Sequence, residues 1–361
     1  MTIDHKNLSR EQRIIAIQRL TALWAFSESG LGGIMHALQI PFTGLVVGGL
    51  AVILISFIAQ ISEHQYKEIL KSLLIVLIIK AMVSPYTPFP AYIAVSFQAI
   101  LGYILFSLFR INLVSILLLS IITMLESALQ QLLILTLFFG QSIWKATDVF
   151  VAAIAKQLGM FAVNGSQWVI GIYLLVYLAG GISITWLAWK IVIRFSIGNI
   201  SMDWKNDPAF NKEIPIAIPG KKNNKQKLWL LVLILVALSL VLFFIAADTK
   251  QGWIAVLKTI SWTLAAIMIW FMLINPFLTK LIKQFLHKKE GNYSEEVSRV
   301  LSFLPVLRQL TAAAWQKSKP YKGWERLHFF LNTLIHWSLT YNDESAEAGG
   351  AITEMTFKKN A

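Results

Sequence analysis

The sequence of 361 residues contains no cysteine, which excludes disulfide bonds, thiolate metal sites and iron–sulfur clusters. Charge is also scarce, because only 14% of the residues are Asp, Glu, Lys or Arg whereas 56% are hydrophobic. A soluble domain of this length needs more charged side chains to cover its surface. The composition therefore argues against a soluble protein.

Motifs of known catalytic centres are missing as well. The sequence has no GxSxG nucleophile elbow, no HExxH zinc motif and no phosphate-binding P-loop. Its six histidines are scattered without the spacing of metal ligands. No aspartate falls in a long apolar stretch, so the paired acidic motifs of membrane prenyl or phosphoalcohol transferases are absent too. We expect no enzyme activity, no cofactor and no metal site.

What the chain has instead is a series of long apolar stretches with few or no charges. Crossing ~30 Å of hydrocarbon at ~1.5 Å per residue takes about 20 residues, and these stretches approach or exceed that length. A soluble helical bundle is the alternative, but a stretch such as Leu228–Ala247 has no polar face to turn toward water. The pattern predicts an all-α integral membrane protein with about eight transmembrane helices. We expect them at residues 14–38, 42–61, 69–83, 91–109, 113–140, 167–192, 228–247 and 253–285.

The segments between these helices differ in character. Three prolines between Pro85 and Pro90 must separate two helices, and Asn275-Pro276 predicts a kink. Residues 141–165 are mildly amphipathic and predict an interfacial helix rather than a span. We therefore divide the chain into a six-helix membrane domain (1–195), a basic cytoplasmic loop (196–227), a two-helix membrane hairpin (228–286), a cytoplasmic region of amphipathic helices (287–342) and a disordered tail (343–361).

Basic residues outnumber acidic residues by 32 to 19, which gives a net charge of +13. Most of them fall on one side when successive helices alternate in direction, as the positive-inside rule requires. We expect a multi-pass protein of the bacterial inner (plasma) membrane with both termini in the cytoplasm and with basic loops that meet anionic lipid. The basic residues form no stripe with exposed aromatics in a soluble domain, so we expect no nucleic-acid partner.

Three ionisable side chains fall inside predicted spans, where a charge costs about 2.5–3.5 kcal/mol near the centre. They are Glu28, Lys80 and Glu126, and three less costly polar side chains accompany them: His36, Gln98 and Gln130. One interpretation is that all six line an outward-facing polar cavity that binds a small solute; Glu126 and Gln130, four residues apart, share one helix face. The other is structural: a carboxylate pairs with Lys80 or is protonated, and Lys80 reaches the membrane surface.

Glycines cluster in the first two predicted spans. Gly44 and Gly48 form a small-xxx-small pair that lets two helices approach closely. Gly30 and Gly33 follow Glu28 directly, so they either pack against a neighbour or interrupt the helix and expose its backbone. We expect all four to be helix-packing positions.

The first ~195 residues resemble the substrate-binding membrane subunits (S components) of energy-coupling-factor vitamin transporters. The resemblance rests on six apolar helices, the glycine-rich passage from Glu28 to Gly49, and the turn Ser84-Pro85…Pro88-Phe89-Pro90-Ala91-Tyr92. It implies a subunit that binds a small molecule from outside and works with another transporter subunit and with ATPases. The last two predicted spans and the C-terminal region depart from that family's layout, and the Ala-Arg-Gly motif of the coupling partner is missing.

Two functions remain open from the sequence. The first is an uptake permease or transporter subunit for a small solute, with Glu28 and Glu126 in its site. The second is a scaffold without transport activity that recruits a partner through its C-terminal helices. That alternative rests on aromatic residues in a segment too short for a large core: Trp315, Trp324, Phe329, Phe330 and Trp337.

Overall fold

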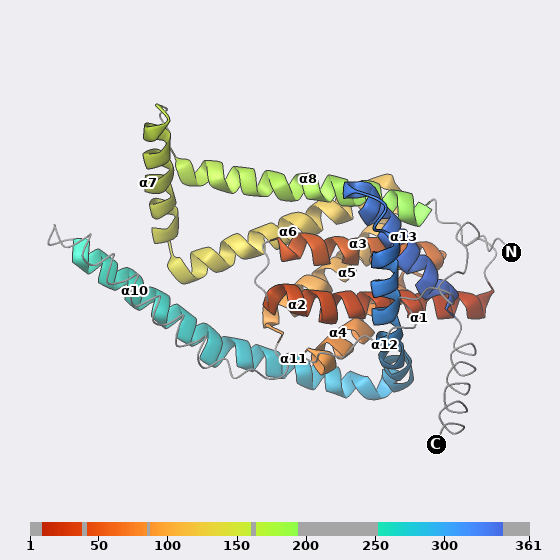
Figure 1. Ribbon diagram of the computed structural model, residues 1–361. Helices are drawn as coiled ribbons and strands as arrows, with labels where there is room; N and C mark the ends of the chain where they lie inside the picture. Colours follow the sequence, from red (N-terminus) through yellow and green to blue (C-terminus); the bar gives the residue numbers. More distant parts are fainter. Residues whose placement is uncertain (1–8, 38–41, 85–86, 160–163, 194–251, 342–361) are drawn as a thin grey trace, which may run out of the picture.

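The computed structural model describes residues 9–37, 42–84, 87–159, 164–193 and 252–341. The predicted basic loop 196–227, the predicted span 228–247 and the predicted tail 343–361 lie outside the described residues. All regular elements in the described part are helices (Figure 1). They are α1 (Arg10–Phe26), η2 (Ser27–Leu31), α2 (Gly32–Ala37), α3 (Thr43–Ile61), α4 (Lys67–Val83), α5 (Phe89–Phe109), α6 (Leu113–Phe139), α7 (Ser142–Gln157), α8 (Gly165–Ile193), α10 (Gly252–Met268), η4 (Ile269–Ile274), α11 (Asn275–Glu290), η5 (Gly291–Tyr293), α12 (Ser294–Lys317) and α13 (Gly323–Thr340).

Five stretches in the described part are long and apolar enough to cross a membrane. They are Thr43–Ile61, Phe89–Phe109, Leu113–Phe139, Gly165–Val192 and the helical run Ile260–Lys317. This confirms the all-α class for the described residues and is consistent with a multi-pass membrane protein. The total of about eight spans stays a prediction, since α1 and α4 have only 17 residues each.

Helix ends follow from local chemistry. Ser9 caps α1 through a capping box with Gln12, in which each side chain accepts a hydrogen bond from the other residue's backbone N–H. Asn112 and Ser115 form the same reciprocal arrangement at the start of α6. Proline occupies the first turn of α5, where the missing backbone N–H costs nothing. The prolines therefore separate α4 from α5, as the sequence predicts.

The helix α3 lies at the centre of the bundle and packs against α1, α5, α6 and α8. At these crossings the helices approach each other closely because one of them has a glycine at the contact. A Cβ on Gly102 of α5 would lie 2.7 Å from Cγ2 of Ile55, and one on Gly49 would lie 2.6 Å from Cδ1 of Ile184 in α8. The inner helices therefore pack at distances that only a residue without a side chain permits.

The helix α7 stands roughly perpendicular to α8 at one end of the bundle (Figure 1). Asp148 connects the two helices, because its Oδ1 accepts a hydrogen bond of 2.6 Å from the backbone N–H of Ser166. This hydrogen bond lowers the pKa of the Asp148 carboxyl. The side chains of Val149, Phe150 and Leu158 are exposed. The helix α7 is therefore amphipathic as expected, and its place at a membrane interface stays a prediction.

The helices α12 and α13 form a cap at the opposite end of the bundle, against α1, α4 and α8. The Arg19 guanidinium of α1 lies 3.8 Å from the centre of the Phe303 ring, and Lys71 Nζ of α4 lies 3.0 Å from Glu296 Oε1. Trp337 is fully buried in the core that the cap shares with the bundle. The C-terminal helices are therefore part of the same folded unit as the membrane helices.

A π-helical segment precedes the predicted kink at Asn275-Pro276. The backbone N–H of Asn275 donates to the carbonyl of Trp270, five residues earlier, in η4. The Asn275 side chain accepts a hydrogen bond of 3.1 Å from the backbone N–H of Phe89, at the free N-terminus of α5. This contact fixes the start of α11 against α5.

Candidate functional site

The most deeply buried charged groups in the described part form one ion pair. Lys80 Nζ donates to Glu28 Oε2 over 2.7 Å, and the two side chains are only 5% and 4% exposed. Lys80 comes from the last turn of α4, and Glu28 comes from the π-helical segment η2. The sequence places these residues 52 positions apart, so the fold alone brings them together.

The backbone around Glu28 is wider than an α-helix. The N–H of Gly32 donates to the carbonyl of Ser27, five residues earlier, which inserts one extra residue into this turn. The hydroxyl of Ser27 donates to the carbonyl of Trp24. The hydroxyl of Ser29 is buried and has no hydrogen-bond partner among the described residues. The segment that presents Glu28 thus also holds an unpaired polar group, and π-segments of this kind are frequent at functional sites.

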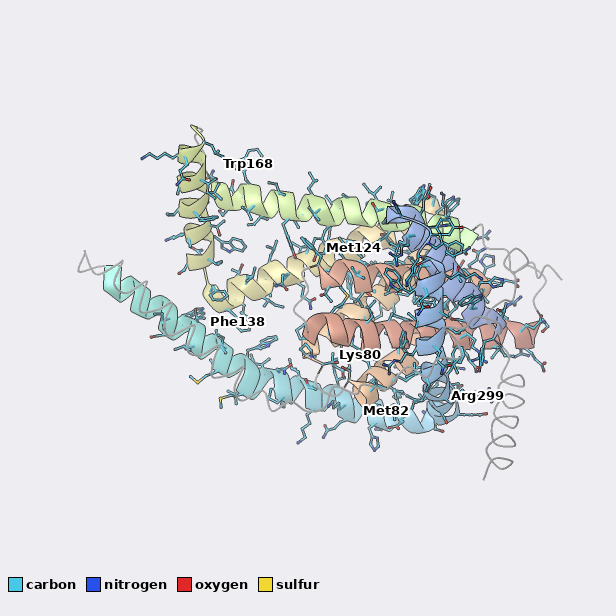
Figure 2. All side chains as sticks on the ribbon, viewed as in Figure 1. Lys80, Met82, Met124, Phe138, Trp168 and Arg299 are labelled. Carbon is cyan, nitrogen blue, oxygen red and sulfur yellow. The ribbon has the colours of Figure 1, made fainter. Side chains whose placement is uncertain are left out.

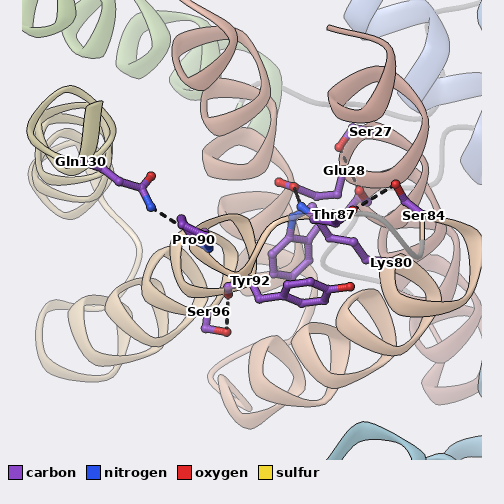
Figure 3. Close-up of polar contacts among 10 residues, drawn as sticks. Ser27, Glu28, Lys80, Ser84, Thr87, Pro90, Tyr92, Ser96 and Gln130 are labelled. Atoms are coloured by element: carbon purple, nitrogen blue, oxygen red, sulfur yellow. Dashed lines mark hydrogen bonds and ion pairs between the residues drawn. The ribbon is translucent and has the colours of Figure 1, made fainter. Parts of the chain in front are cut away.

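Tyr92 of α5 is another buried polar side chain. Its ring is almost fully buried, and its hydroxyl is a buried group without a hydrogen-bond partner within the described ranges. Figure 3 shows Tyr92 on the side of α5 that faces Glu28 and Lys80, with Gln130 on the other side. Tyr92 also lines an open groove of about 290 Å³ between α5 and α11, together with Ser96 and Ile282. The groove therefore includes Tyr92, whereas Glu28 and Lys80 do not line it.

A second group of polar side chains follows the contact of α5 with α6. Gln130 Nε2 donates to the carbonyl of Pro90 over 3.2 Å. Gln98 is buried next to Gly48 of α3, and its Oε1 has no partner among the described residues. Glu126 Oε2 is buried and unpaired in the same sense. Because Gln130 meets Pro90 and Leu119 meets Gly102, the antiparallel register places Glu126 opposite the stretch from Tyr92 to Gln98.

The structure therefore brings only some of the predicted site residues together. Glu28 and Lys80 form a pair, whereas Glu126, Gln98 and Gln130 lie along α6 and α5. The helix α6 packs against α3, α5 and α8, whereas η2 packs against α1, α3 and α4. His36 lies in α2, and its side chain is outside the described positions.

The predicted packing glycines occupy two kinds of environment. Gly44 and Gly48 lie against α6, where a Cβ on Gly44 would approach the Ser127 Cβ to 3.1 Å and one on Gly48 would approach the Met124 Cε to 3.3 Å. Around Gly30 the nearest neighbour is the ring of Phe26 on the same helical run, at 3.5 Å. Gly33 faces the Ser84 hydroxyl at 3.7 Å. Gly44 and Gly48 thus permit a helix crossing, whereas Gly30 and Gly33 belong to the widened turn or follow it.

The electrostatics of the pair decide what it is able to do. Two charges removed from water cost several kcal/mol each, and their mutual attraction roughly offsets this only while both partners stay in contact. The pair as a whole is neutral, so it fits in an apolar bundle, but each group alone does not. No group of three metal-ligating side chains comes together within the described residues.

Family models, characterised proteins and solved structures were compared with this chain. None of them matches. The function must therefore be argued from the residues themselves.

Sequence reasoning missed two members of the site. Ser29 is a small polar residue that a span tolerates, and the sequence offers no sign that its hydroxyl is unpaired. Tyr92 had a usable signal, because it begins the buried face of α5 that continues through Val95, Gln98 and Ala99. A tyrosine on the same face as a glutamine indicates a polar interior surface.

Proposed function

We propose that this chain is an uptake permease, or the solute-binding subunit of a transporter, in the bacterial inner membrane. Its substrate is a small polar solute, and its site is centred on Glu28 and Lys80. The resemblance of the first ~195 residues to S components favours the same role and adds a partner subunit with ATPases as the source of energy.

The observation that carries this proposal is the set of buried polar groups at the Glu28–Lys80 pair and along α5 and α6. Besides the pair, the hydroxyls of Ser29 and Tyr92 are buried without a hydrogen-bond partner among the described residues. The same holds for Gln98 Oε1 on α5 and Glu126 Oε2 on α6. Buried polar atoms without partners cost free energy. A bound solute satisfies such atoms.

Two tryptophans on α8 support a position for the membrane surfaces relative to the bundle. Trp168 and Trp186 lie on α8, are 68% and 44% exposed, and stand 18 residues apart, which is about 27 Å at ~1.5 Å per residue. Exposed apolar side chains fill the interval between them: Val169, Ile172, Leu175, Val176 and Ile182. Tryptophans gather at both membrane surfaces, and the interval matches the ~30 Å hydrocarbon layer. Figure 2 shows Trp168 at the corner of α7 and α8, at the end opposite Arg299 of the cap.

The charges then favour the cap as the cytoplasmic end. Lys190 follows Trp186 and lies 3.9 Å from its ring, and Lys71 joins the same end of α4 to the cap. Lys80, nine residues beyond Lys71, lies toward the end that carries α7. This orientation supports access to the pair from outside. Because the chain has no native cysteine, Gln157→Cys on α7 and Ser302→Cys on α12 test it with an impermeant maleimide. We expect labelling of the first in intact cells and of the second only after permeabilisation.

The function is tested by solute binding and uptake. The purified protein in lipid nanodiscs is screened by thermal unfolding against amino acids, sugars, nucleosides and vitamins, and the solutes that stabilise it are tested for uptake into cells. Glu28→Gln combined with Lys80→Met should abolish both effects, whereas Lys145→Met on the exposed face of α7 should change neither. If no solute stabilises the wild-type protein, the proposal fails.

The scaffold hypothesis retains one observation in its favour, which is the exposed aromatic surface of Tyr321 and Trp324 on the cap. Trp315 is exposed as well and packs edge-on against Phe330, whereas Trp337 of the same segment is buried. Tyr321 and Trp324 also contact rings of the fold, those of Phe329 and Trp186. Tyr321→Ser with Trp324→Ser separates the two functions. A scaffold should lose its cellular function with this variant, and a permease should retain uptake.

A further inference from the structure

The Glu28–Lys80 pair restricts the kind of solute that its site accepts. Each side chain now meets the other's charge over 2.7 Å, within a protein interior where neither is more than 5% exposed. A solute can form its own ion pairs or hydrogen bonds with both charged groups only if it separates Glu28 from Lys80. The inference that follows rests on the proposed function and concerns the chemical class of the solute.

The outcome of separation depends on the charge of the solute. A neutral solute placed between Glu28 and Lys80 leaves two buried charges without opposite charges. A solute with one charge satisfies one side chain and leaves the other unpaired, which is the costly situation for a buried group. A solute with an ammonium group and a carboxylate satisfies both, because its ammonium meets Glu28 and its carboxylate meets Lys80. One buried ion pair then becomes two.

The surroundings fit such an exchange. Lys80 has a flexible four-carbon stem, and Glu28 belongs to a π-helical turn whose backbone bonding differs from that of the helix on either side. The hydroxyls of Ser29 and Tyr92 are buried without partners among the described residues. A carboxylate accepts hydrogen bonds from hydroxyls, and an ammonium group donates to them. A solute that reaches these two hydroxyls gains polar contacts in addition to the two ion pairs.

We infer that the solute is a compact zwitterion of the amino-acid type, with its ammonium and carboxylate groups close enough to be inserted between Glu28 and Lys80. The groove that begins at Tyr92 is lined mainly by apolar side chains such as Phe97 and Ile100. A zwitterion with an apolar side chain matches a buried ion pair together with this apolar groove.

The test compares matched sets of solutes on the full-length protein in nanodiscs. The probes are the common α-amino acids, β-alanine and glycine betaine. Each amino acid is compared with its amide, which carries only the positive charge, and with its hydroxy acid, which carries only the negative charge. Equilibrium binding of at least one zwitterion is expected, with its single-charge analogues roughly 10- to 100-fold weaker, the scale of one lost hydrogen bond to a charged group.

Three variants connect the binding to the pair. Glu28→Gln with Lys80→Met keeps a neutral core, which folds about as well as a buried ion pair, and it should lose zwitterion binding. The exchange Glu28→Lys with Lys80→Glu keeps both charges and should retain a preference for zwitterions over single-charge analogues. Lys71→Met with Glu296→Gln removes an ion pair of the same type from the cap and should leave binding unchanged.

The outcomes separate this inference from the proposed function. Suppose that the wild type binds a neutral solute and the Glu28→Gln, Lys80→Met variant does not. That result would overturn the inference that the solute is a zwitterion and leave the permease proposal standing. Equal binding of a zwitterion by that variant and by the wild type would overturn the role of the pair. Binding of no solute at all would overturn both.

Discussion

Helices α3 and α8 are similarly apolar stretches of sequence, but they occupy opposite environments. In α3, 72% of the residues in its most apolar window are buried within the protein, compared with 22% in α8. In water such a difference would appear as a polar face on α8. In a bilayer it does not, because lipid tails are as apolar as a protein core. The comparison shows that hydrophobic residues do not reveal which helix faces lie in the interior of this protein, whereas polar and small residues do.

The largest expected effect comes from leaving a charge unpaired in the interior. Lys80→Met removes the partner of buried Glu28 and should lower the free energy of unfolding by about 3–5 kcal/mol. Adding Glu28→Gln should recover most of that loss. Thermal unfolding in nanodiscs measures all three proteins. Lys145→Met on exposed α7 is the control and should have no measurable effect; a similar loss there would contradict the contrast between interior and surface.

The next comparison removes one apolar side chain from each environment. Leu119 of α6 is fully buried, so Leu119→Ala leaves a cavity and should cost about 2–4 kcal/mol. Leu175 of α8 is 64% exposed, and lipid fills the space after Leu175→Ala, so its effect should stay within about 0.5 kcal/mol. Thermal unfolding of both leucine variants in nanodiscs measures the two losses of stability. Equal losses would show that α8 is covered by protein on its exposed face.

Glycines sharpen the same contrast with a smaller change. A Cβ on Gly102 would lie 2.7 Å from Ile55 Cγ2, a branch of a stiff side chain, so Gly102→Ala should destabilise the protein by about 1–3 kcal/mol. Nothing lies within 4 Å of the corresponding position at Gly171 of α8. There Gly171→Ala should stabilise the helix by up to about 1 kcal/mol. Opposite signs in thermal unfolding are the expected result, and a matching loss at both sites would refute it.

The smallest effect concerns the one end of α8 that the cap covers. Burial, followed by the charge of Lys190, lowers the pKa of His328 from its usual value of 6.5. The unfolded chain therefore takes up this proton first, so stability is complete above about pH 6.5 and falls as the pH drops toward the folded pKa. Unfolding temperatures between pH 8 and pH 5 should fall less for His328→Gln than for the wild type. Parallel curves would show that His328 titrates normally.

Much of the fold was predictable because its local signals are strong. The prolines around Pro88 separate two helices, Asn275-Pro276 lies directly after an irregular segment, and residues 141–165 contain a helix perpendicular to its neighbour. For the site, the sequence identified Glu28 and Lys80 as charged groups whose burial in a membrane span costs free energy, and it left open whether they pair. The structure shows the pair. It also shows that α6, the helix that carries Glu126, packs mainly against α8, α3 and α5, which helix order did not reveal.

The sequence by itself determined the class of this protein, because the length and apolarity of a span depend only on consecutive residues. It also determined where helices break, since proline and capping residues act on their immediate neighbours. Only the tertiary structure decided which helix faces are inside, which charges meet, and that the hydroxyls of Ser29 and Tyr92 are buried without partners among the described residues. The physical reason is that lipid and protein interior exert the same local preference on apolar residues. Only the contacts between helices that are distant in sequence show whether an apolar residue faces lipid or the protein interior.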